Sequence, residues 1–519
     1  MLKKLMFGYT TRKMQLGWQV KHGDFKATYI IISLIVIAIP FISTYTLVTF
    51  YLNERLLNYT PQWSDEVVYW HQVATFREEG FHGGYYSINE QPAPFSFIHY
   101  YVHGPAYPIL FGIVAKLVGW KLYYAPFLNI LLLTLALAWF ILATRPGYSQ
   151  LLMIGLTLLT FWPTQLFMAT NMRVGLFSAA AVVMALFFYK IIQAPDSVSR
   201  FNLVLFFLLI GLMALFQISW ALLFIPYMFL LRERLRMSVG MACVVSIVLL
   251  VISYVVFDLI VAPYPLYFTS QLLGTIQASP SKGLIFFFQH AFENTCNFFG
   301  PGQDSLWLVL RVQLLLLITG CGFLLWRQLN DRAAVRESVM VLTNCGLLLI
   351  ETVLLFDILH WRDYRLFGPI VLMAVLVLIA RKKMWFSVGL VIINLLFTGQ
   401  FLADYKAMLT SAFPDNRTAI RQFSEEIAPF VQFDKTAGGW ENTLLTSPEI
   451  AGHQLLLGVL PGIGLSWFTS PDELPTIKSR YLLLDKKDYE ALHERTCLEY
   501  KLTTDIGDLY VNLGNQCNK

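Results

Sequence analysis

The stretch "ATYIIISLIVIAIPFISTYTLVTF" (residues 27–50) decides the fold, because it carries no charged side chain along its whole length. An apolar run of this length is typical of a transmembrane helix. The segment before it is polar and basic, and no cleavable signal peptide is evident. We therefore expect the span to stay as an anchor with its N-terminus in the cytoplasm. The basic residues of that segment are Lys3, Lys4, Arg12, Lys13, Lys21 and Lys26.

The composition of the 519 residues extends this interpretation to the whole chain: 56% are hydrophobic and only 14% are charged. A soluble domain carries about 25% charged residues, so the deficit predicts a polytopic α-helical membrane protein. Aromatic residues reach 15%, and many Trp and Tyr flank the apolar runs as interface anchors do. The net charge of +5 is modest, and nothing points to a nucleic-acid partner.

Eleven apolar segments predict about eleven transmembrane helices. They lie near residues 27–50, 124–143, 150–170, 174–193, 201–217, 219–231, 238–260, 304–326, 338–357, 366–381 and 384–402. The number of spans in 201–231 stays open. If all cross, nearly every basic cluster between spans falls in the cytoplasm, as the positive-inside rule requires. That topology holds only if residues 104–120 form an interfacial or re-entrant helix that does not cross.

The same topology divides the chain into a membrane domain, residues 1–402, and a small C-terminal α/β domain, residues 403–519, on the outer face. Two outer loops result, at 51–122 and 261–303, and "FFFQHAF" in the second predicts another interfacial helix. In the C-terminal domain, a helix pattern at 418–431 alternates with the strand-like runs "NTLLTS", "RYLLLD" and "DLYVNL". Cys497 and Cys517 form a disulfide only if this domain is outside the cytoplasm, and the sequence leaves that pairing open.

The segment "WSDEVVYW" (residues 63–70) follows the first span and places two carboxylates, Asp65 and Glu66, at the membrane surface. One interpretation is a helix start, with Ser64 as the N-cap and acidic side chains in the first turn. The other is chemistry on a lipid-borne substrate. On a helix, Asp65 and Tyr69 share a face while Glu66 turns away, so the two carboxylates need not act together.

The wider pattern resembles the first outer loop of the GT-C superfamily of membrane glycosyltransferases, closest to the protein O-mannosyltransferase and aminoarabinose-transferase type. In that family an acidic pair is followed by a Tyr, a Gly and an "H-P-P-x-Y" start to an interfacial helix. Here Gly104 replaces the first of the paired prolines. The matching residues are Asp65, Glu66, Tyr69, Gly80, His103, Pro105, Tyr107 and Gly119.

The resemblance implies an inverting sugar transfer from a polyprenyl-phosphate donor. Asp65 would be the general base toward an acceptor hydroxyl, with Glu66 in support. The donor phosphate needs cations at the membrane surface. Exceptions to the positive-inside rule supply Arg173 and the segment "RDYR", which contributes Arg362, Tyr364 and Arg365. Tyr69, His103 and Tyr107 complete the expected substrate contacts. Gln217 stands where many relatives carry a Lys, which leaves open whether the arginines bind phosphate alone or the donor differs.

A metal site is not expected. His99 and His103 are four residues apart and would share a face if that stretch were helical, but no metal-binding pattern accompanies them. We expect no cofactor, although a divalent metal stays possible.

Two other functions remain open: a transporter or flippase of lipid-linked glycans, and a non-catalytic membrane assembly protein. Transporters place ionisable residues in the middle of spans, and only Arg311 and Glu351 fit that description. We expect a protein of the bacterial inner membrane whose partners are a polyprenyl-phosphate sugar, membrane lipids and a glycan, lipid or protein acceptor. The sequence does not identify the donor sugar, the acceptor or the oligomeric state.

Overall fold

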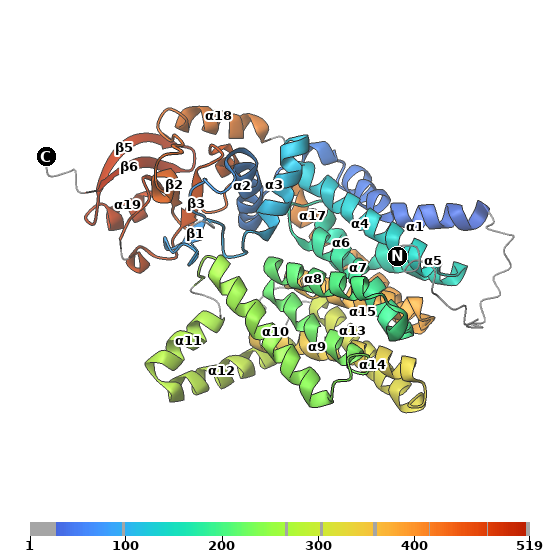
Figure 1. The fold of residues 1–519 in the computed structure, drawn as a ribbon. Coiled ribbons are helices and arrows are strands. Elements are labelled where there is room, and N and C mark those ends of the chain that lie inside the picture. Colours follow the sequence, from blue (N-terminus) through green and yellow to red (C-terminus); the bar gives the residue numbers. More distant parts are fainter. Residues whose placement is uncertain are drawn as a thin grey trace, which may run out of the picture.

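The computed structural model describes residues 27–95, 99–264, 268–300, 305–355, 361–414, 416–474 and 476–514. It has two parts, a bundle of helices and a unit built on a six-stranded sheet at one end of that bundle (Figure 1). Helices α2 (Ser64–Glu79) and α3 (Ala106–Val118) of the first predicted outer loop lie between the two parts. This loop therefore joins the bundle to the sheet.

The bundle contains the predicted spans. Its helices are α1 (Ala27–Thr46), α4 (Tyr124–Thr144), α5 (Tyr148–Thr160), α6 (Trp162–Met168), α7 (Val174–Gln193), α8 (Arg200–Phe216), α9 (Phe224–Leu231), α10 (Val239–Ile260), α13 (Ser305–Arg327), α14 (Arg332–Ile350), α15 (Gly368–Ala380), α16 (Met384–Leu396) and α17 (Thr398–Leu409). Short π-helical turns extend α1 as Leu47–Tyr51 and α14 as Glu351–Leu355. Short 3₁₀ turns precede α9 as Ile218–Leu223 and α15 as Trp361–Leu366.

All eleven predicted apolar segments contain helix, but the structure does not confirm eleven crossings. Within the described residues, six helices are long and apolar enough to cross a membrane, or up to eight if each of two bent pairs is one span. The pairs α5–α6 and α16–α17 each bend by 60°. Helix α15 has only 13 residues. At 1.5 Å per residue it rises roughly 20 Å, less than the ~30 Å of a hydrocarbon core.

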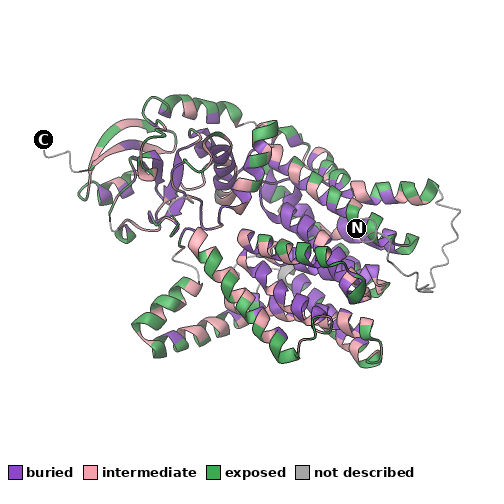
Figure 2. Ribbon diagram, in the orientation of Figure 1, coloured by how far each residue is buried: buried purple, intermediate pink, exposed green. Residues whose placement is uncertain are grey.

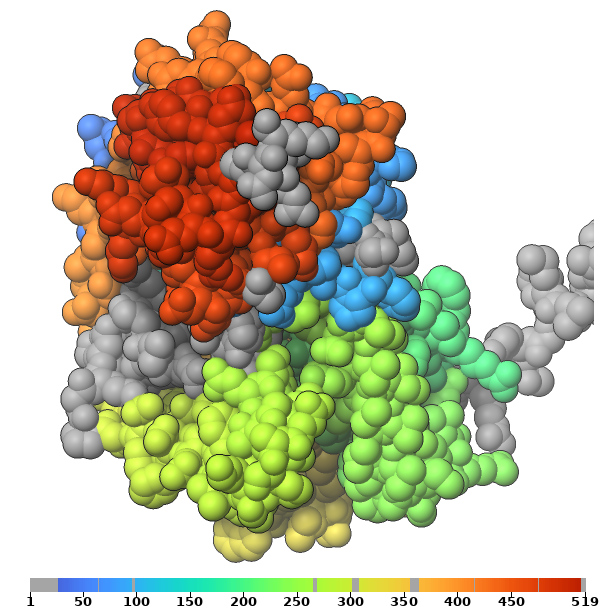
Figure 3. Space-filling model, turned by 90° about the vertical axis from the view of Figure 1, so that its left-hand side faces the viewer, coloured from blue at the N-terminus to red at the C-terminus, as the bar shows by residue number. Residues whose placement is uncertain are grey.

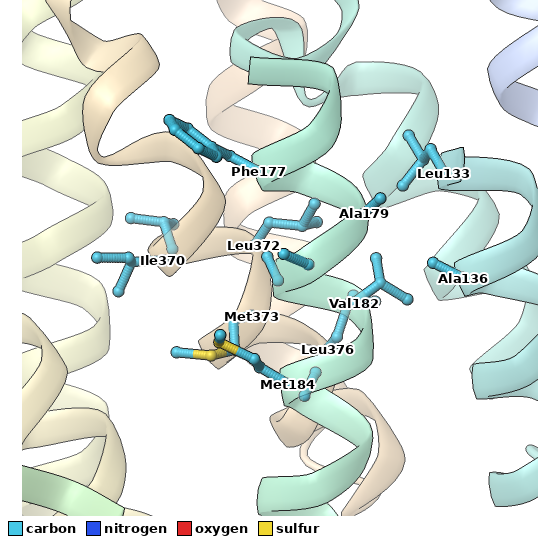
Figure 4. Close-up of a cluster of buried hydrophobic side chains, with 14 of the residues drawn as sticks. Leu133, Ala136, Phe177, Ala179, Val182, Met184, Ile370, Leu372, Met373 and Leu376 are labelled. Carbon is cyan, nitrogen blue, oxygen red and sulfur yellow. The ribbon is translucent and has the colours of Figure 1, made fainter. Parts of the chain in front are cut away.

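The centre of the bundle is α7, which packs between α4 and α15 (Figure 4). Leu133 of α4 and Leu372 of α15 approach α7 from different sides, and both are buried. Small side chains such as Ala179 and Ala181 let the neighbouring helices come close, as in many membrane bundles. Because Arg173 stands at the N-terminus of this central helix, its position is fixed by the best-packed part of the molecule.

The outer surface of the bundle is apolar, as a lipid-facing surface must be. Helix α10 is largely exposed along its length (Figure 2), and Val244, Ile247 and Val251 are each more than half exposed. Helix α3 buries Tyr107 and Phe111 and exposes apolar side chains on its other face. It has 13 residues, fewer than the roughly 20 that a crossing helix needs. The position of residues 104–120 at the interface stays a prediction.

The second predicted outer loop contains two helices, α11 (Phe268–Ala278) and α12 (Pro280–Phe299), where the sequence predicted one. They extend away from the bundle in Figure 1, and Figure 3 shows them in yellow-green below the red C-terminal unit. Phe288 and Phe292 of α12 are exposed. An exposed apolar face on a helix outside the bundle is typical of an interfacial segment.

The sheet has the order β1-β3-β2-β4-β6-β5. Its strands are β1 (Ser87–Ile88), β2 (Thr443–Thr446), β3 (Gly464–Trp467), β4 (Tyr481–Leu484), β5 (Cys497–Thr504) and β6 (Gly507–Gly514). The first four strands are parallel, and β6 and β5 complete the sheet as an antiparallel hairpin. Helices α18 (Arg417–Ile427) and α19 (Lys486–Leu492) flank the sheet. The predicted helix at 418–431 corresponds to α18, and the three predicted strands correspond to β2, β4 and β6, whereas β1, β3 and β5 were not predicted.

The sheet is not confined to the C-terminal residues. Strand β1 comes from the first outer loop and pairs with β3 through Ser87 and Ser466, whose hydroxyl oxygens lie 2.9 Å apart. Helix α17 also runs across the predicted boundary between residues 402 and 403 and packs on the bundle. The first loop and the C-terminal residues therefore form one structural unit. Cys517 lies outside the described residues, so its predicted disulfide stays a prediction.

The contact between the first loop and the sheet leaves no room for a side chain at Gly84. A Cβ atom there would lie 1.9 Å from the Asn442 carbonyl oxygen and 2.6 Å from the Gly464 nitrogen. We expect Gly84→Ala to separate the loop from β3 and to destabilise this unit by about 1–3 kcal/mol, the usual effect of overpacking. Thermal unfolding of the purified protein in detergent measures the change.

The matched control is Gly438→Ala in the same unit, where a Cβ atom has no neighbour within 4 Å. Equal melting temperatures for the two variants would contradict the close packing of the loop on the sheet.

Candidate functional site

Asp65 stands in the first turn of α2, and its side chain is one-quarter exposed. His103 Nε2 donates a hydrogen bond of 3.4 Å to one carboxylate oxygen, and an Arg365 Nη atom lies 3.7 Å from the other. Burial alone would raise the pKa of Asp65, but the His103 hydrogen bond and the charges of Arg365 and Arg173 outweigh it and hold that pKa well below its usual range. The structure thus presents an ionised and accessible carboxylate.

His103 lies in the loop that leads into α3. Burial and then the nearby charge of Arg173 lower the pKa of its ring, which keeps the imidazole neutral at pH 7. A neutral ring protonated on Nε2 still donates to Asp65. The Tyr69 ring centroid lies 5.5 Å from that of His103 and 5.2 Å from that of Tyr107. Tyr69 and Tyr107 therefore form an aromatic wall beside the carboxylate.

Arg173 is held firmly and is only 8% exposed. One Nη atom donates to the Phe216 carbonyl oxygen and, at 3.5 Å, to that of His103. Its guanidinium carbon also lies 5.2 Å from the Tyr69 ring centroid. These contacts make Arg173 a brace between α7, the His103 loop and the end of α8.

Gln217 follows Phe216 at the end of α8 and is buried. Its Nε2 donates to the Ser219 hydroxyl at 2.8 Å, whereas its Oε1 has no hydrogen-bond partner among the described residues. Gln217 is thus a neighbour of the Arg173 brace, and the structure shows no contact between it and Asp65.

Arg365 is the more open of the two cations, with one-quarter of its side chain exposed. Besides Asp65, its guanidinium carbon lies 5.9 Å from the Trp63 ring centroid. Tyr364 points the other way: it is buried in the bundle, and its hydroxyl donates to Gln313 Oε1. The structure therefore brings Arg365 but not Tyr364 to Asp65. The side chain of Arg362 lies outside the described residues.

Glu66 is 1% exposed and lies on the opposite side of the helix start from the opening at Asp65. Its carboxylate accepts hydrogen bonds from the Tyr59 hydroxyl at 2.7 Å and from the backbone N–H of Asn171 at 2.8 Å. The backbone N–H groups of Gln62 and Trp63 donate to its other oxygen at 3.2 and 3.3 Å. Helix α2 includes Ser64, so Trp63 takes the N-cap position predicted for Ser64.

Asn171 and Tyr59 were not predicted from the sequence. The Asn171 side chain donates to the Glu66 carbonyl oxygen at 2.7 Å and accepts from the Tyr107 hydroxyl at 3.1 Å. It thereby ties α2 and α3 to the turn before α7. The sequence signal that could have identified Asn171 was the polar pair Thr170–Asn171 between two apolar segments. Asn171 stands two residues before Arg173.

The histidines of the first loop lie in different parts of it. His99 and His103 precede α3 in a loop and share no helix face. His71 is buried on α2 and contacts the Tyr86 hydroxyl and the Val459 carbonyl oxygen. Within the described ranges, no group of three metal ligands surrounds Asp65. Whether transfer needs a metal stays a prediction.

A cavity of about 250 Å³ lies at the other end of the bundle, lined by residues that include Arg145, Gln193 and Arg381. Arg173 and Gln193 stand at opposite ends of α7, about 30 Å apart at the rise of an α-helix. The cavity therefore belongs to a different surface from Asp65.

No protein-family profile matches the chain, and no curated protein matches it either. Solved structures do match. ArnT from Cupriavidus metallidurans bound to undecaprenyl phosphate is 12% identical, with 94% of this chain and 98% of that chain covered and a TM-score of 0.47. ArnT in the apo state is 13% identical, with coverages of 93% and 97% and a TM-score of 0.49.

The archaeal oligosaccharyltransferase AglB from Archaeoglobus fulgidus, in complex with an inhibitory peptide and a dolichol-phosphate, is 11% identical. The match covers 94% of this chain and 75% of that chain, with a TM-score of 0.46. These neighbours are membrane glycosyltransferases of the GT-C fold, the superfamily that the first outer loop resembles. At such identities and TM-scores the likeness carries no argument about activity, which has to rest on the residues of this chain.

The four hydrogen-bond donors around Glu66 predict that its substitution by glutamine lowers the stability of the protein. Glu66→Gln turns an amide NH₂ toward at least one of these N–H or O–H groups, and a buried donor left without an acceptor costs about 1–3 kcal/mol. We expect a lower unfolding temperature in detergent. Glu78→Gln is the matched control, since Glu78 lies on the same helix, is exposed and pairs only with Arg77. A loss of stability no greater than that of the control would show that the Glu66 hydrogen bonds do not hold α2.

Proposed function

We propose that the chain is a glycosyltransferase of the GT-C superfamily that moves a sugar from a polyprenyl-phosphate donor to an acceptor hydroxyl with inversion. The single observation that carries the proposal is the accessible Asp65 carboxylate with Arg365 at 3.7 Å, at the end of a membrane bundle. A base and a phosphate-binding cation within one short distance are the two groups that this reaction requires.

Asp65 is the general base. A neutral hydroxyl is a poor nucleophile, and a carboxylate within hydrogen-bond reach can remove its proton as the hydroxyl attacks the anomeric carbon. For inversion the base stands on the face of the sugar opposite the leaving phosphate. The partial exposure of Asp65 gives an acceptor access to it, whereas the buried Glu66 gives none. Glu66 is then a positioning residue.

Arg365 is the contact for the donor phosphate. Its 3.7 Å approach to Asp65 is a loose ion pair, and a guanidinium has five N–H donors to offer. When phosphate draws Arg365 away, Asp65 loses a charge that lowers its pKa and becomes a stronger base. Donor binding would thus activate the base. Arg173 and Gln217 support the site from the interior of the bundle. The acceptor side is lined by Tyr69, His103 and Tyr107.

In this proposal the reaction takes place at the membrane surface. The apolar helices keep a lipid-linked donor within reach of Arg365. We place the site on the periplasmic side of a bacterial inner membrane, because the basic clusters between the predicted spans favour the cytoplasmic side. The polyprenyl phosphates bound by the ArnT and AglB structures are ligands of those proteins. For this chain the donor class rests on Arg365 and on the bundle, and the acceptor can be a glycan, a lipid or a protein.

The transporter alternative rests on two charged residues. Arg311 lies in the candidate span Leu308–Arg327 and reaches the Gly300 carbonyl oxygen at 3.5 Å, and Glu351 is buried in the candidate span Arg332–Leu354. A transport path would use ionisable residues inside spans, whereas the accessible pair of Asp65 and Arg365 favours transfer. A non-catalytic assembly protein would have no use for an ionised carboxylate beside an open arginine.

Asp65→Asn tests the proposal. The amide keeps the shape of the carboxylate but cannot accept the proton, so we expect transfer from a polyprenyl-phosphate sugar to fall by about 10²–10⁴-fold. Radiolabelled transfer by the purified protein measures the rate, and an unchanged melting temperature shows that the variant is folded. Full activity of the variant would refute the assignment of the base, and an inactive wild type with every donor would favour transport or assembly.

His103→Ala gives an independent test through pH. Removal of the ring takes away a hydrogen bond that lowers the pKa of Asp65, so this pKa rises and the carboxylate is protonated at a higher pH. We expect the acid limb of the kcat/KM profile to move upward in pH. His82→Ala serves as control, because His82 is an exposed histidine of the same loop. Superimposable acid limbs would exclude His103 as the group that sets the ionisation of Asp65.

A further inference from the structure

The carboxyl ends of β2 and β4 form a second place where the fold concentrates polar groups. The two strands are parallel neighbours, with Thr446 opposite Leu483. After β2 the chain adds β3 on one side, and β4 then returns to the other side of β2. In open parallel sheets, ligands bind at the carboxyl ends of strands where the connections diverge in this way.

Three carboxylates meet at this edge: Glu449 after β2, Asp485 directly after β4, and Asp488 in α19. One oxygen from each lies within 4.8 Å of the others. Glu449 is exposed, Asp485 is half-buried and Asp488 is only 4% exposed. None of the three forms an ion pair with a basic side chain in the described part of the chain. Lys487 is a basic neighbour whose charge acts on Asp488 without forming an ion pair with it.

Asp488 supplies a separate indication of a ligand. Its Oδ2 atom is buried and has no hydrogen-bond partner among the described residues. Burial raises the pKa of Asp488, a hydrogen bond from Ser447 lowers it, the charges of Asp485 and Glu449 raise it further, and the charge of Lys487 lowers it. A buried carboxylate oxygen without a donor, beside two further carboxylates, is a poor arrangement unless something positive joins it.

We propose that Glu449, Asp485 and Asp488 bind a divalent cation, with Ca²⁺ preferred. Ligand oxygens lie 2.3–2.6 Å from Ca²⁺, so three oxygens within 4.8 Å of one another can share one ion. Ca²⁺ accepts an irregular set of oxygens, whereas Mg²⁺ demands near-ideal octahedral geometry. The ligands are all carboxylates, without Cys or His, which favours a hard cation over Zn²⁺. Exposed Glu449 leaves room for water ligands.

The ion would act on the unit that contacts α2, the helix that carries Asp65. It would join the loop after β2 to α19, and so fix the centre of a sheet whose edge strand β1 belongs to the first outer loop. A ligand that binds only the folded state stabilises it in proportion to ln(1 + [L]/Kd). Ca²⁺ should therefore raise the unfolding temperature of the full chain.

The test uses the purified full-length protein in detergent after treatment with a chelator. Titration with Ca²⁺ is followed by thermal unfolding and by calorimetry, with Mg²⁺ and Zn²⁺ in parallel. We expect a saturable increase in unfolding temperature with Ca²⁺, a smaller one with Mg²⁺, and loss of the Ca²⁺ response in Asp488→Asn. Glu490→Gln is the control, since Glu490 is an exposed carboxylate on the same helix outside the cluster.

Without metal, Asp488→Asn should unfold at the same temperature as the wild type or above it, because the change removes repulsion among the carboxylates. If that variant does not fold, the exposed Glu449→Gln replaces it. A wild type that does not respond to Ca²⁺, a response only to Zn²⁺, or an equal response in the cluster variants and the control would overturn the proposal. Because the readout is stability and binding, the result is independent of any sugar transfer.

Discussion

The buried carboxylate of Glu66 is the interaction on which the arrangement of the site depends. Taking a charge out of water is unfavourable unless hydrogen bonds replace the lost solvation, and here donors from Tyr59, Gln62, Trp63 and Asn171 replace it. Three of them come from residues 59–63, shortly before Glu66, and the fourth comes from the turn before α7. The charge is satisfied by all four donors only when these two segments lie together.

That fixed position gives the neighbouring Asp65 its properties. Consecutive residues on a helix point about 100° apart, so Asp65 points away from the buried Glu66, and its side chain is one-quarter exposed. There it meets His103 and Arg365, from segments far apart in the sequence. The two adjacent carboxylates differ in their surroundings: hydrogen-bond donors stabilise Glu66 in the interior, whereas Asp65 is kept ionised at the surface. Glu66 fits the helix-start interpretation, with Trp63 rather than Ser64 as the N-cap, and the chemical role of Asp65 stays a proposal.

The sequence was informative wherever one local pattern determined the outcome. The apolar runs predicted the helices, the alternating runs predicted β2, β4 and β6, and the charge distribution placed Asp65 and Arg365 at the same end of the bundle. The sequence did not reveal contacts between residues that lie far apart along the chain. Strand β1 has two residues and is recognisable only through its pairing with β3. Asn171 matters because it contacts Glu66, and Tyr364 does not belong to the site because its hydroxyl meets Gln313. The count of crossings stays a prediction, because apolar runs do not determine helix length.

The sheet and the bundle both restrain the loop that carries Asp65. Because β1 belongs to the first outer loop, the ordered sheet restrains the loop that carries Asp65. On the bundle side, the backbone N–H of Asn171 restrains the same loop through its hydrogen bond to Glu66. His71 of α2 reaches the Val459 carbonyl oxygen at 3.0 Å, so the helix itself contacts the sheet unit between its strands. The carboxylate is therefore held from both sides, and only Arg365 and the His103 loop remain to respond to a substrate. This arrangement suits the proposed reaction, in which Asp65 keeps its position while Arg365 turns toward the donor phosphate.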